Sequence, residues 1–352
     1  MEVPFLDASG DAYEIGETIG RTFADRLRAF IGFKQEVLRK DTQNQRSVLE
    51  QASARFLKWC RQCGPHLIDE MRGYADGAGV SLDDVVMMNC GDEARACATA
   101  ASSEGCTAFA LAPQATGGPV LAGQSKDGPG PQWDHYVVLR IRPKNRPALL
   151  QLAYPGMLAL LGMSETGMCI CTNQIHDGVR SDGLPVMLIK RLAWEIESVA
   201  DVERLIQVHH AATASNFLLC DRSGNAICLE LRGEHYGRVD MDDGILIHAN
   251  HYLTESLRGH EDPVRVAAHG SPLRQSRLAA LFNQRRGRIT VSDVFACYRD
   301  HRGYPNAICA HESTDEYRGT TAVFVAEPQA GLLHVNVGRT CQNHPQTYAL
   351  TS

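Results

Sequence analysis

The spacing of apolar residues divides the chain into a helical first part and a strand-rich remainder. Over residues 12–40, apolar side chains recur every three or four positions, which predicts an amphipathic helix. The same spacing continues over residues 47–62 and 65–78. Ser81, followed closely by two aspartates, resembles a helix start with the serine as N-cap. The first hundred residues are therefore expected to be mostly helical.

After residue 105 the pattern changes to short apolar runs separated by turns. These runs predict strands at 107–111, 120–123, 135–142, 148–153, 168–172, 216–220, 226–231, 245–249, 321–326 and 332–337. They are interrupted by predicted helical blocks at 184–210, 272–284 and 291–299. Runs of strands broken by helical blocks, without strict alternation of strand and helix, favour an α+β fold with largely antiparallel sheets.

Composition and charge narrow the class of protein. The chain has 352 residues, of which 44% are hydrophobic and 22% charged, as in ordinary globular proteins. Its net charge of -6 gives no basic footprint for nucleic acid. No apolar run reaches the length of about 18 residues that predicts a membrane span, and the chain start lacks the pattern of a secretion signal. We therefore expect a cytoplasmic protein with no nucleic-acid or membrane partner.

Twelve cysteines raise the question of metal or redox chemistry. Cys60 and Cys63 have CxxC spacing, but no second pair at matched spacing completes a zinc site, so packing or surface thiols are the simpler interpretation. Several others, including Cys309, sit in apolar runs, where a reduced cysteine packs as a small hydrophobe. The sequence carries no glycine-rich nucleotide loop and no HExxH segment. It therefore predicts no metal and no cofactor.

The most informative segment is Gly105-Cys106-Thr107, where the helical part gives way to strands. A cut between Gly105 and Cys106 would make the cysteine the first residue of a new chain, with a thiol and a free α-amine on one residue. An α-amine titrates at about 7.7–8.0 in peptides and can take the thiol proton near neutral pH. In the uncut chain, the thiol would attack the Gly105 carbonyl and water would hydrolyse the thioester. Glycine suits this step because it tolerates strained backbone angles.

Four further segments stand in order along the chain and carry a resemblance. They are Gly123-Gln124-Ser125-Lys126-Asp127, Ser164-Glu165-Thr166-Gly167-Met168 with Thr172-Asn173, His248-Ala249-Asn250-His251, and Arg318-Gly319-Thr320-Thr321. Together with the Gly-Cys-Thr site, they resemble the motifs of the acyl-coenzyme A:6-aminopenicillanic acid acyltransferase-like family. This family is a cysteine branch (peptidase C45 type) of the N-terminal nucleophile (Ntn) hydrolases. The resemblance covers nearly the whole chain.

The resemblance implies a four-layer αββα sandwich, in which two antiparallel sheets lie between helical layers. It implies a helical segment over residues 1–105 that stays associated after cleavage, and a catalytic segment over 106–352 that begins at the nucleophile. The activity it implies is that of an autoprocessing amidohydrolase or acyltransferase, which acts on a small N-acyl amide through a thioester on Cys106. A coenzyme A thioester is a candidate acyl donor on the same ground.

The resemblance also implies roles for individual residues. Cys106 would be the nucleophile and, through its amine, the base, while Asp127 would bind and orient that amine. Asn250 would donate its side-chain N–H to the oxyanion of the intermediate. Arg318 would place a charged fork near the nucleophile. Two further residues are expected to contact substrate, Thr107 and Asn173.

Departures from the family pattern leave alternatives open. The family's Asn-Trp before the aspartate is Ser125-Lys126 here, so the substrate should differ from a penicillin side chain. Asp134 rivals Asp127 as the orienting carboxylate, and Asp127 itself could be a turn residue. Asn250 could instead bond the backbone at a strand end, and Arg318 could be a solvated arginine.

Two other functions compete with the autoprocessing enzyme. One is an unprocessed cysteine hydrolase that uses His248 or His251 as its base. The other is a non-catalytic member of the same fold that binds an acylated ligand. Alkylation of Cys106 with the pH dependence of a histidine would favour the first competitor, and an inert Cys106 would favour the second.

Overall fold

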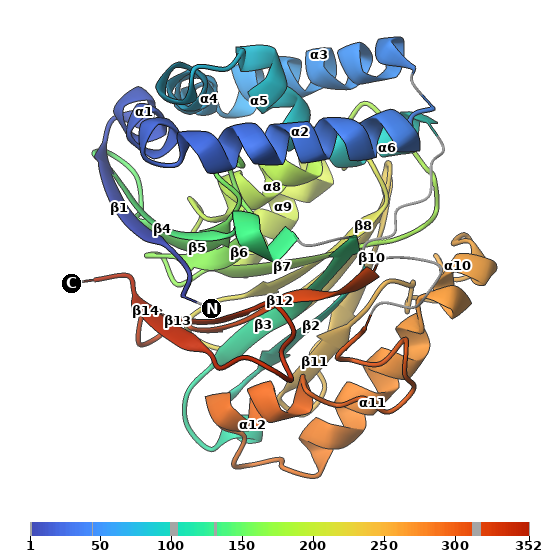
Figure 1. Cartoon of the computed structure of the whole chain (residues 1–352). Helices are drawn as coiled ribbons and strands as arrows, with labels where there is room; N and C mark the ends of the chain where they lie inside the picture. The colour runs from blue at the N-terminus through green and yellow to red at the C-terminus, as the bar shows by residue number, and fades with distance from the viewer. Residues whose placement is uncertain (1, 44, 99–104, 130–131, 312–317, 352) are drawn as a thin grey trace.

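Two sheets packed face to face, with helices over the outer face of each, make up the computed structural model (Figure 1). The structure describes residues 2–43, 45–98, 105–129, 132–311 and 318–351. The predicted four-layer αββα sandwich of the α+β class is confirmed. Among the described residues, no helix combines the length and apolar character needed to cross a membrane.

The first helical layer is built largely from the N-terminal part of the chain. Its helices are α1 (Ala12–Thr22), α2 (Ala24–Asp41), α3 (Arg46–Cys63), α4 (His66–Ala78), α5 (Leu82–Asn89) and α6 (Gly91–Ala98), with α8 (Val186–Ala193) and α9 (Val199–His209) beneath them. The expected single helix over 12–40 is two helices that meet at Phe23. Ser81 is the N-cap of α5, as predicted, because its hydroxyl accepts a hydrogen bond from the backbone N–H of Asp84.

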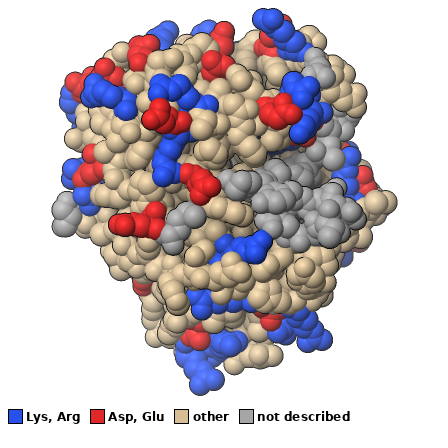
Figure 2. Space-filling view, in the orientation of Figure 1, with Lys and Arg blue, Asp and Glu red and all other residues tan. Residues whose placement is uncertain are grey.

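Charged side chains on this layer are largely paired within their own helices. Arg28 with Asp25 and Arg39 with Glu36 are examples along α2. Figure 2 shows acidic and basic side chains intermixed over the layer. On the face that Figure 2 shows, the described residues of this layer present no broad basic field.

Sheet A carries eight strands in the order β1-β4-β5-β6-β7-β8-β9-β10. Their bounds are β1 (Phe5–Gly10), β4 (Val137–Pro143), β5 (Leu149–Ala153), β6 (Leu161–Ser164), β7 (Cys169–Gln174), β8 (Ser215–Cys220), β9 (Ala226–Arg232) and β10 (His235–Asp240). The segment over 1–105 is mostly helical, but it opens with β1, which pairs in parallel with β4. The other pairs in this sheet are antiparallel.

Sheet B carries six antiparallel strands in the order β11-β2-β3-β12-β13-β14. Their bounds are β2 (Gly105–Leu111), β3 (Leu121–Pro129), β11 (Ile245–His248), β12 (Arg318–Glu327), β13 (Leu332–Val337) and β14 (Gln346–Ala349). Its outer face is covered by α11 (Ser271–Asn283) and α12 (Val291–Cys297). Three short elements complete the description: α7 (Pro113–Thr116), a 3-10 turn (Gln132–His135) and α10 (Pro263–Ala268).

The two faces of β2 belong to different cores. Ala108 and Ala110 pack in the core between the sheets, whereas Phe109 and Leu111 pack against α11 and α12. Side chains alternate along a strand, so Cys106 shares the inner face and Thr107 the outer one. This register places the cysteine between the two sheets.

Candidate active site

Cys106 lies at the start of β2 and is 7% exposed. It lines a cavity of about 80 Å³, whose walls come from β3, β7 and α8 as well as from β2. Thr107 does not line this cavity, because its side chain points toward α11. The buried thiol therefore faces a small enclosed space in which a reacting group could be held.

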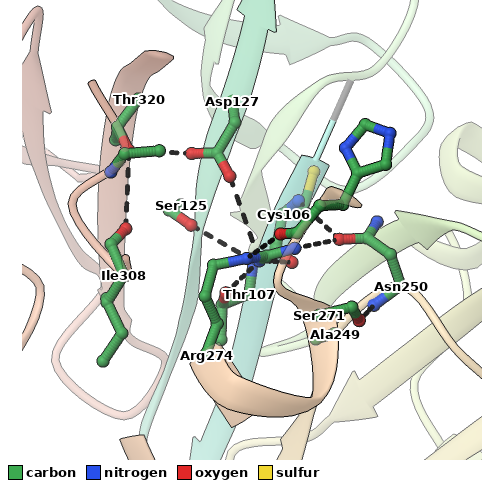
Figure 3. Close-up of polar contacts among 12 residues, drawn as sticks. Cys106, Thr107, Ser125, Asp127, Ala249, Asn250, Ser271, Arg274, Ile308 and Thr320 are labelled. Carbon is green, nitrogen blue, oxygen red and sulfur yellow. Dashed lines mark hydrogen bonds and ion pairs between the residues drawn. The ribbon is translucent and has the colours of Figure 1, made fainter. Parts of the chain in front are cut away.

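The backbone around Cys106 is held by two side chains (Figure 3). Its N–H donates to Asn250 Oδ1 at 3.0 Å, and its carbonyl accepts from Arg274 Nη1 at 2.6 Å. Arg274 Nη2 also donates to Asn250 Oδ1, at 2.7 Å. The three residues form one buried network centred on the nitrogen that cleavage would turn into the α-amine.

Asn250 is brought to Cys106 as predicted, but with its oxygen toward the cysteine. Its Nδ2 donates to the backbone carbonyl of Gln174 at 2.9 Å, and its backbone N–H donates to Ser271 Oγ at 2.7 Å. The expected contact with backbone at a strand end is therefore also present. The amide nitrogen carries two N–H donors and one of them is bonded to Gln174, so the predicted donation to an oxyanion would need the second.

Asp127 lies on β3 directly opposite Gly105 in the strand register. Its carboxylate is fully buried: Oδ1 accepts from the Thr320 hydroxyl at 2.8 Å, and Oδ2 lies 3.9 Å from Arg274 Nη1. Oδ2 accepts no hydrogen bond from the described residues. The interpretation of Asp127 as a turn residue is wrong, because β3 continues to Pro129. Its rival Asp134 is exposed, in the 3-10 turn.

Arg274 is the central residue that the sequence analysis missed. It is almost fully buried on the inner face of α11, where it also donates to Thr107 Oγ1 at 2.5 Å. A signal was present, because Arg274 stands four positions before Leu278 and so shares the face that the helix buries. A charge at an apolar position of an amphipathic helix marks a buried ion pair or a functional site.

Two lysines add positive charge beside the thiol. Lys126 lies opposite Cys106 in the β2–β3 register, and Lys190 of α8 lines the same cavity. Burial, together with the neighbouring charge of Lys126, lowers the pKa of Lys190 to about 8. Cationic surroundings favour the thiolate form of a cysteine. Neither lysine was singled out from the sequence.

Asn173 lies on β7, which packs against β2 across the cavity. Its side chain is fully buried, and neither amide atom has a hydrogen-bond partner among the described residues. A buried amide in this condition is rare in folded proteins unless a ligand or water completes it. Asn173 is therefore well placed to contact a substrate carbonyl.

The neighbouring histidines are already engaged. His248 Nε2 lies 2.7 Å from a Glu230 carboxylate oxygen, and its Nδ1 lies 2.9 Å from the Ala249 carbonyl oxygen. His251 Nδ1 lies 2.7 Å from Ser271 Oγ. Burial and the nearby His248 lower the pKa of His251 to about 4, so it is a weak base. These contacts disfavour a histidine as the base that activates Cys106.

Arg318 can be placed only through its backbone. It opens β12 opposite Pro129, two positions before the Thr320 that is paired with Asp127. Its side chain lies outside the described part of the chain. The role expected for it near the nucleophile stays a prediction.

The chain is similar to known proteins over most of its length. Residues 115–342 match the family model described as acyl-coenzyme A:6-aminopenicillanic acid acyl-transferase. The chain is similar to the 40 kDa form of acyl-coenzyme A:6-aminopenicillanic-acid-acyltransferase from Emericella nidulans, with 24% identity over 351 residues, covering 98% of this chain and 95% of the relative.

Two solved structures are also similar. A mutant conjugated bile acid hydrolase from Clostridium perfringens aligns at 14% identity and a TM-score of 0.44, over 69% of this chain and 96% of the other. Penicillin V acylase from Agrobacterium tumefaciens aligns at 12% identity and a TM-score of 0.39, over 66% of this chain and 74% of the other.

Proposed function

This chain belongs to the acyl-coenzyme A:6-aminopenicillanic acid acyltransferase family, and from that premise we propose that it is an autoprocessing N-terminal-cysteine amidohydrolase or acyltransferase. Family membership supports the broader class, an enzyme that transfers acyl groups or hydrolyses amides. The observation that carries the finer proposal is the polar network around the Cys106 nitrogen. A peptide nitrogen needs no such network for chemistry, whereas an α-amine that must act as a base does.

The first step of the proposal is cleavage of the chain. The Cys106 thiolate attacks the Gly105 carbonyl carbon, the C–N bond breaks, and the nitrogen takes a proton to become the α-amine. Water then hydrolyses the thioester, which leaves a carboxylate on Gly105 and a free thiol on Cys106. Lys126 and Lys190 support this step because their charges stabilise the attacking thiolate.

The surrounding side chains suit the new amine. Asn250 Oδ1 keeps the hydrogen bond that it already accepts from this nitrogen. Asp127 Oδ2, which accepts no hydrogen bond from the described residues, is available for a second N–H. The nearby Arg274 guanidinium disfavours a second positive charge, so it helps to keep the amine unprotonated and able to accept the thiol proton.

The catalytic cycle then repeats the same attack on a substrate. The amine takes the thiol proton, the thiolate attacks the amide carbonyl, and the leaving amine departs with that proton. Asn173 would donate to the oxyanion, because its amide is unsatisfied among the described residues, and Asn250 could add the side-chain N–H that is not bonded to Gln174. The acyl group remains on Cys106 as a thioester. Water as acceptor gives hydrolysis, which we favour, and an amine as acceptor gives acyl transfer, for which a coenzyme A thioester is the candidate acyl donor.

The charged residues that line the cavity indicate which charge a substrate should carry. Among the described residues that line it, Lys34, Arg95, Lys126 and Lys190 are basic and Asp92 is acidic. Arg95 is ion-paired with Asp92 and with Asp41, so the three lysines carry most of the excess positive charge. We expect a small N-acyl amide that carries a carboxylate near its scissile bond. An N-acyl amino acid should therefore be hydrolysed faster than its methyl ester, which has the same shape without the charge. Equal rates would contradict this part of the proposal.

Intact mass of the denatured protein tests the processing step. Wild type and a Cys171→Ala control should each give two fragments, 1–105 and 106–352, while Cys106→Ala should stay whole. Cys171 is a suitable control because it is buried on the neighbouring β7. A single uncut chain in all three samples would overturn the N-terminal nucleophile mechanism. Incubation with substrate should then add the acyl mass to fragment 106–352.

A further inference from the structure

Four side chains with metal-ligating atoms meet outside the cavity, and none of them lines it. His301 follows α12, Cys309 and His311 lie in the segment that leads to β12, and Cys341 lies between β13 and β14. Their ligand atoms all lie within 4.8 Å of one another. The sequence predicted no metal, and it predicted Cys309 to be a packed hydrophobe. The fold buries Cys309 as predicted and also places it beside three other potential ligands.

The separations from His311 Nε2 to the other three ligand atoms are close to those of a tetrahedral site. Zinc binds sulfur at about 2.3 Å and imidazole nitrogen at about 2.0–2.1 Å, so a tetrahedral ion sets N···N near about 3.3 Å and N···S near about 3.6 Å. The Nε2 atoms of His301 and His311 are 3.0 Å apart. From His311 Nε2, the sulfur of Cys309 lies at 3.6 Å and that of Cys341 at 3.5 Å.

Hydrogen bonding alone accounts poorly for this cluster. An imidazole nitrogen carries either one proton or one lone pair, so it makes one well-directed hydrogen bond. His311 Nε2 nevertheless has three polar neighbours within 3.6 Å. A cation at the centre would satisfy all four ligand atoms at once. Two sulfurs and two imidazoles suit zinc, whereas magnesium, calcium and manganese prefer oxygen ligands.

We propose that His301, Cys309, His311 and Cys341 bind one zinc ion. The site is structural, because four protein ligands complete the tetrahedral coordination and leave no position for substrate. It joins two loops that are distant in sequence, the one that precedes β12 and the one that follows β13. The second loop is also held by Arg299, which donates to the carbonyls of Thr340 and Asn343.

The zinc site is connected by a short chain of hydrogen bonds to Asp127, which lies opposite Gly105 in the β2–β3 register. Ala310, next to Cys309, donates its N–H to Thr320 Oγ1 at 2.9 Å and accepts from the Thr320 N–H at 2.9 Å. Thr320 Oγ1 donates to Asp127 Oδ1 at 2.8 Å. An ion that fixes Cys309 therefore also fixes the hydroxyl that orients Asp127. We expect loss of zinc to slow chain cleavage without removing any residue that touches Cys106.

Metal content of the full chain tests the proposal. The protein is purified under reducing conditions without chelator or affinity metal, and zinc is measured by elemental mass spectrometry. Wild type and Cys63→Ser should hold about one zinc per chain, and Cys341→Ser should lose it by about tenfold or more. Cys63 is the matched control, since it is half-buried like Cys341 and far from the cluster in sequence.

A second measurement keeps the test decisive if Cys341→Ser folds poorly. Zinc is removed from wild type with a chelator and Co²⁺ is added, which in a tetrahedral thiolate site gives a sulfur-to-metal charge-transfer band. Added Zn²⁺ should abolish the band. Three outcomes would overturn the proposal: wild type that takes up neither metal, Cys341→Ser that retains zinc, or a Cys309–Cys341 disulfide in non-reduced peptide maps of the protein as isolated. None of these readouts depends on enzymatic activity.

Discussion

Replacement of Arg274 by methionine tests the network around the nucleophile most directly. The substitution keeps most of the side chain's apolar volume and removes its charge and its donors. Those donors reach Asn250 Oδ1 at 2.7 Å and the carbonyls of Cys106 and His269 at 2.6 and 3.2 Å. The Asp127 carboxylate, 3.9 Å away and fully buried, would lose its neighbouring cation.

The size of the effect follows from the burial of both charges. Removal of one partner of a buried ion pair costs about 3–5 kcal/mol, because the other charge is left uncompensated. The lost hydrogen bonds act in the same direction, but they belong to the same network and are not added separately. We therefore expect Arg274→Met to lower the free energy of unfolding by about 3–5 kcal/mol. Addition of Asp127→Asn should restore about 1–3 kcal/mol, since the stranded carboxylate is then neutral.

Equilibrium urea unfolding, followed by circular dichroism, measures the change. All variants are made in the Cys106→Ala background, so that each sample is one uncut chain. Arg285→Met is the control: Arg285 lies just beyond the same helix, 3.6 Å from Asp293, and both side chains are about one-third exposed. Its loss should cost less than about 1 kcal/mol. If Arg274→Met were no more destabilising than this control, Arg274 would not be the residue that holds the site together.

Three further predictions concern packing, pH and reactivity. A β-carbon at Gly16 would lie 2.1 Å from the backbone carbonyl oxygen of Glu70 in α4. Gly16→Ala should therefore destabilise the protein by about 1–3 kcal/mol in thermal or urea unfolding. A β-carbon at Gly32 would have no neighbouring atom within 4 Å, so Gly32→Ala should stabilise α2 by about 0.5–1 kcal/mol. Equal changes in stability for the two variants would refute the close contact between α1 and α4 at Gly16. Burial raises the pKa of Glu230, but hydrogen bonds and the charge of His248 outweigh it and leave the pKa below its usual value. Ionised Glu230 therefore stabilises the fold fully at pH values above the usual glutamate pKa, and this stabilisation is lost as the pH falls through the lowered pKa of the folded state. The difference in the free energy of unfolding between wild type and Glu230→Gln should therefore disappear in acid. A gap that is constant with pH would contradict this. Lys190→Met should slow alkylation of Cys106 several-fold at neutral pH and move its rate profile to higher pH, because a cation that interacts with the thiolate is lost. An unchanged profile would exclude that interaction.

Local patterns were sufficient to predict most helices and strands. Amphipathic spacing located α3 and α4 within one residue at each end, and apolar runs located the long central strands. The same reasoning missed the short buried β6, and it missed the edge strands β1, β10 and β14, whose positions are mostly exposed or half-buried. Such edge strands are stabilised mainly by hydrogen bonds to a neighbour, which a single segment does not reveal.

The candidate site shows the same difference between local and long-range information. Cys106, Asp127 and Asn250 were predicted from motifs that are contiguous in sequence, and the structure brings all three together. The orientation of Asn250 was not predictable, because its oxygen faces Cys106 only once Gln174 and Arg274 are in place. Of these, Arg274 is 168 positions from Cys106 and carries no local motif.

What the sequence indicated by itself is the order of elements and Cys106 as the candidate nucleophile, because both depend on residues close together in the chain. Tertiary structure decided which side chains surround that nucleophile, since Arg274 and Lys190 reach it only when a helix packs on each outer face. It also decided that His301, Cys309, His311 and Cys341 share one location. The packing of two sheets brings distant segments within a few ångströms of one another. The role of a charge buried there depends on neighbouring residues that are far away in the sequence.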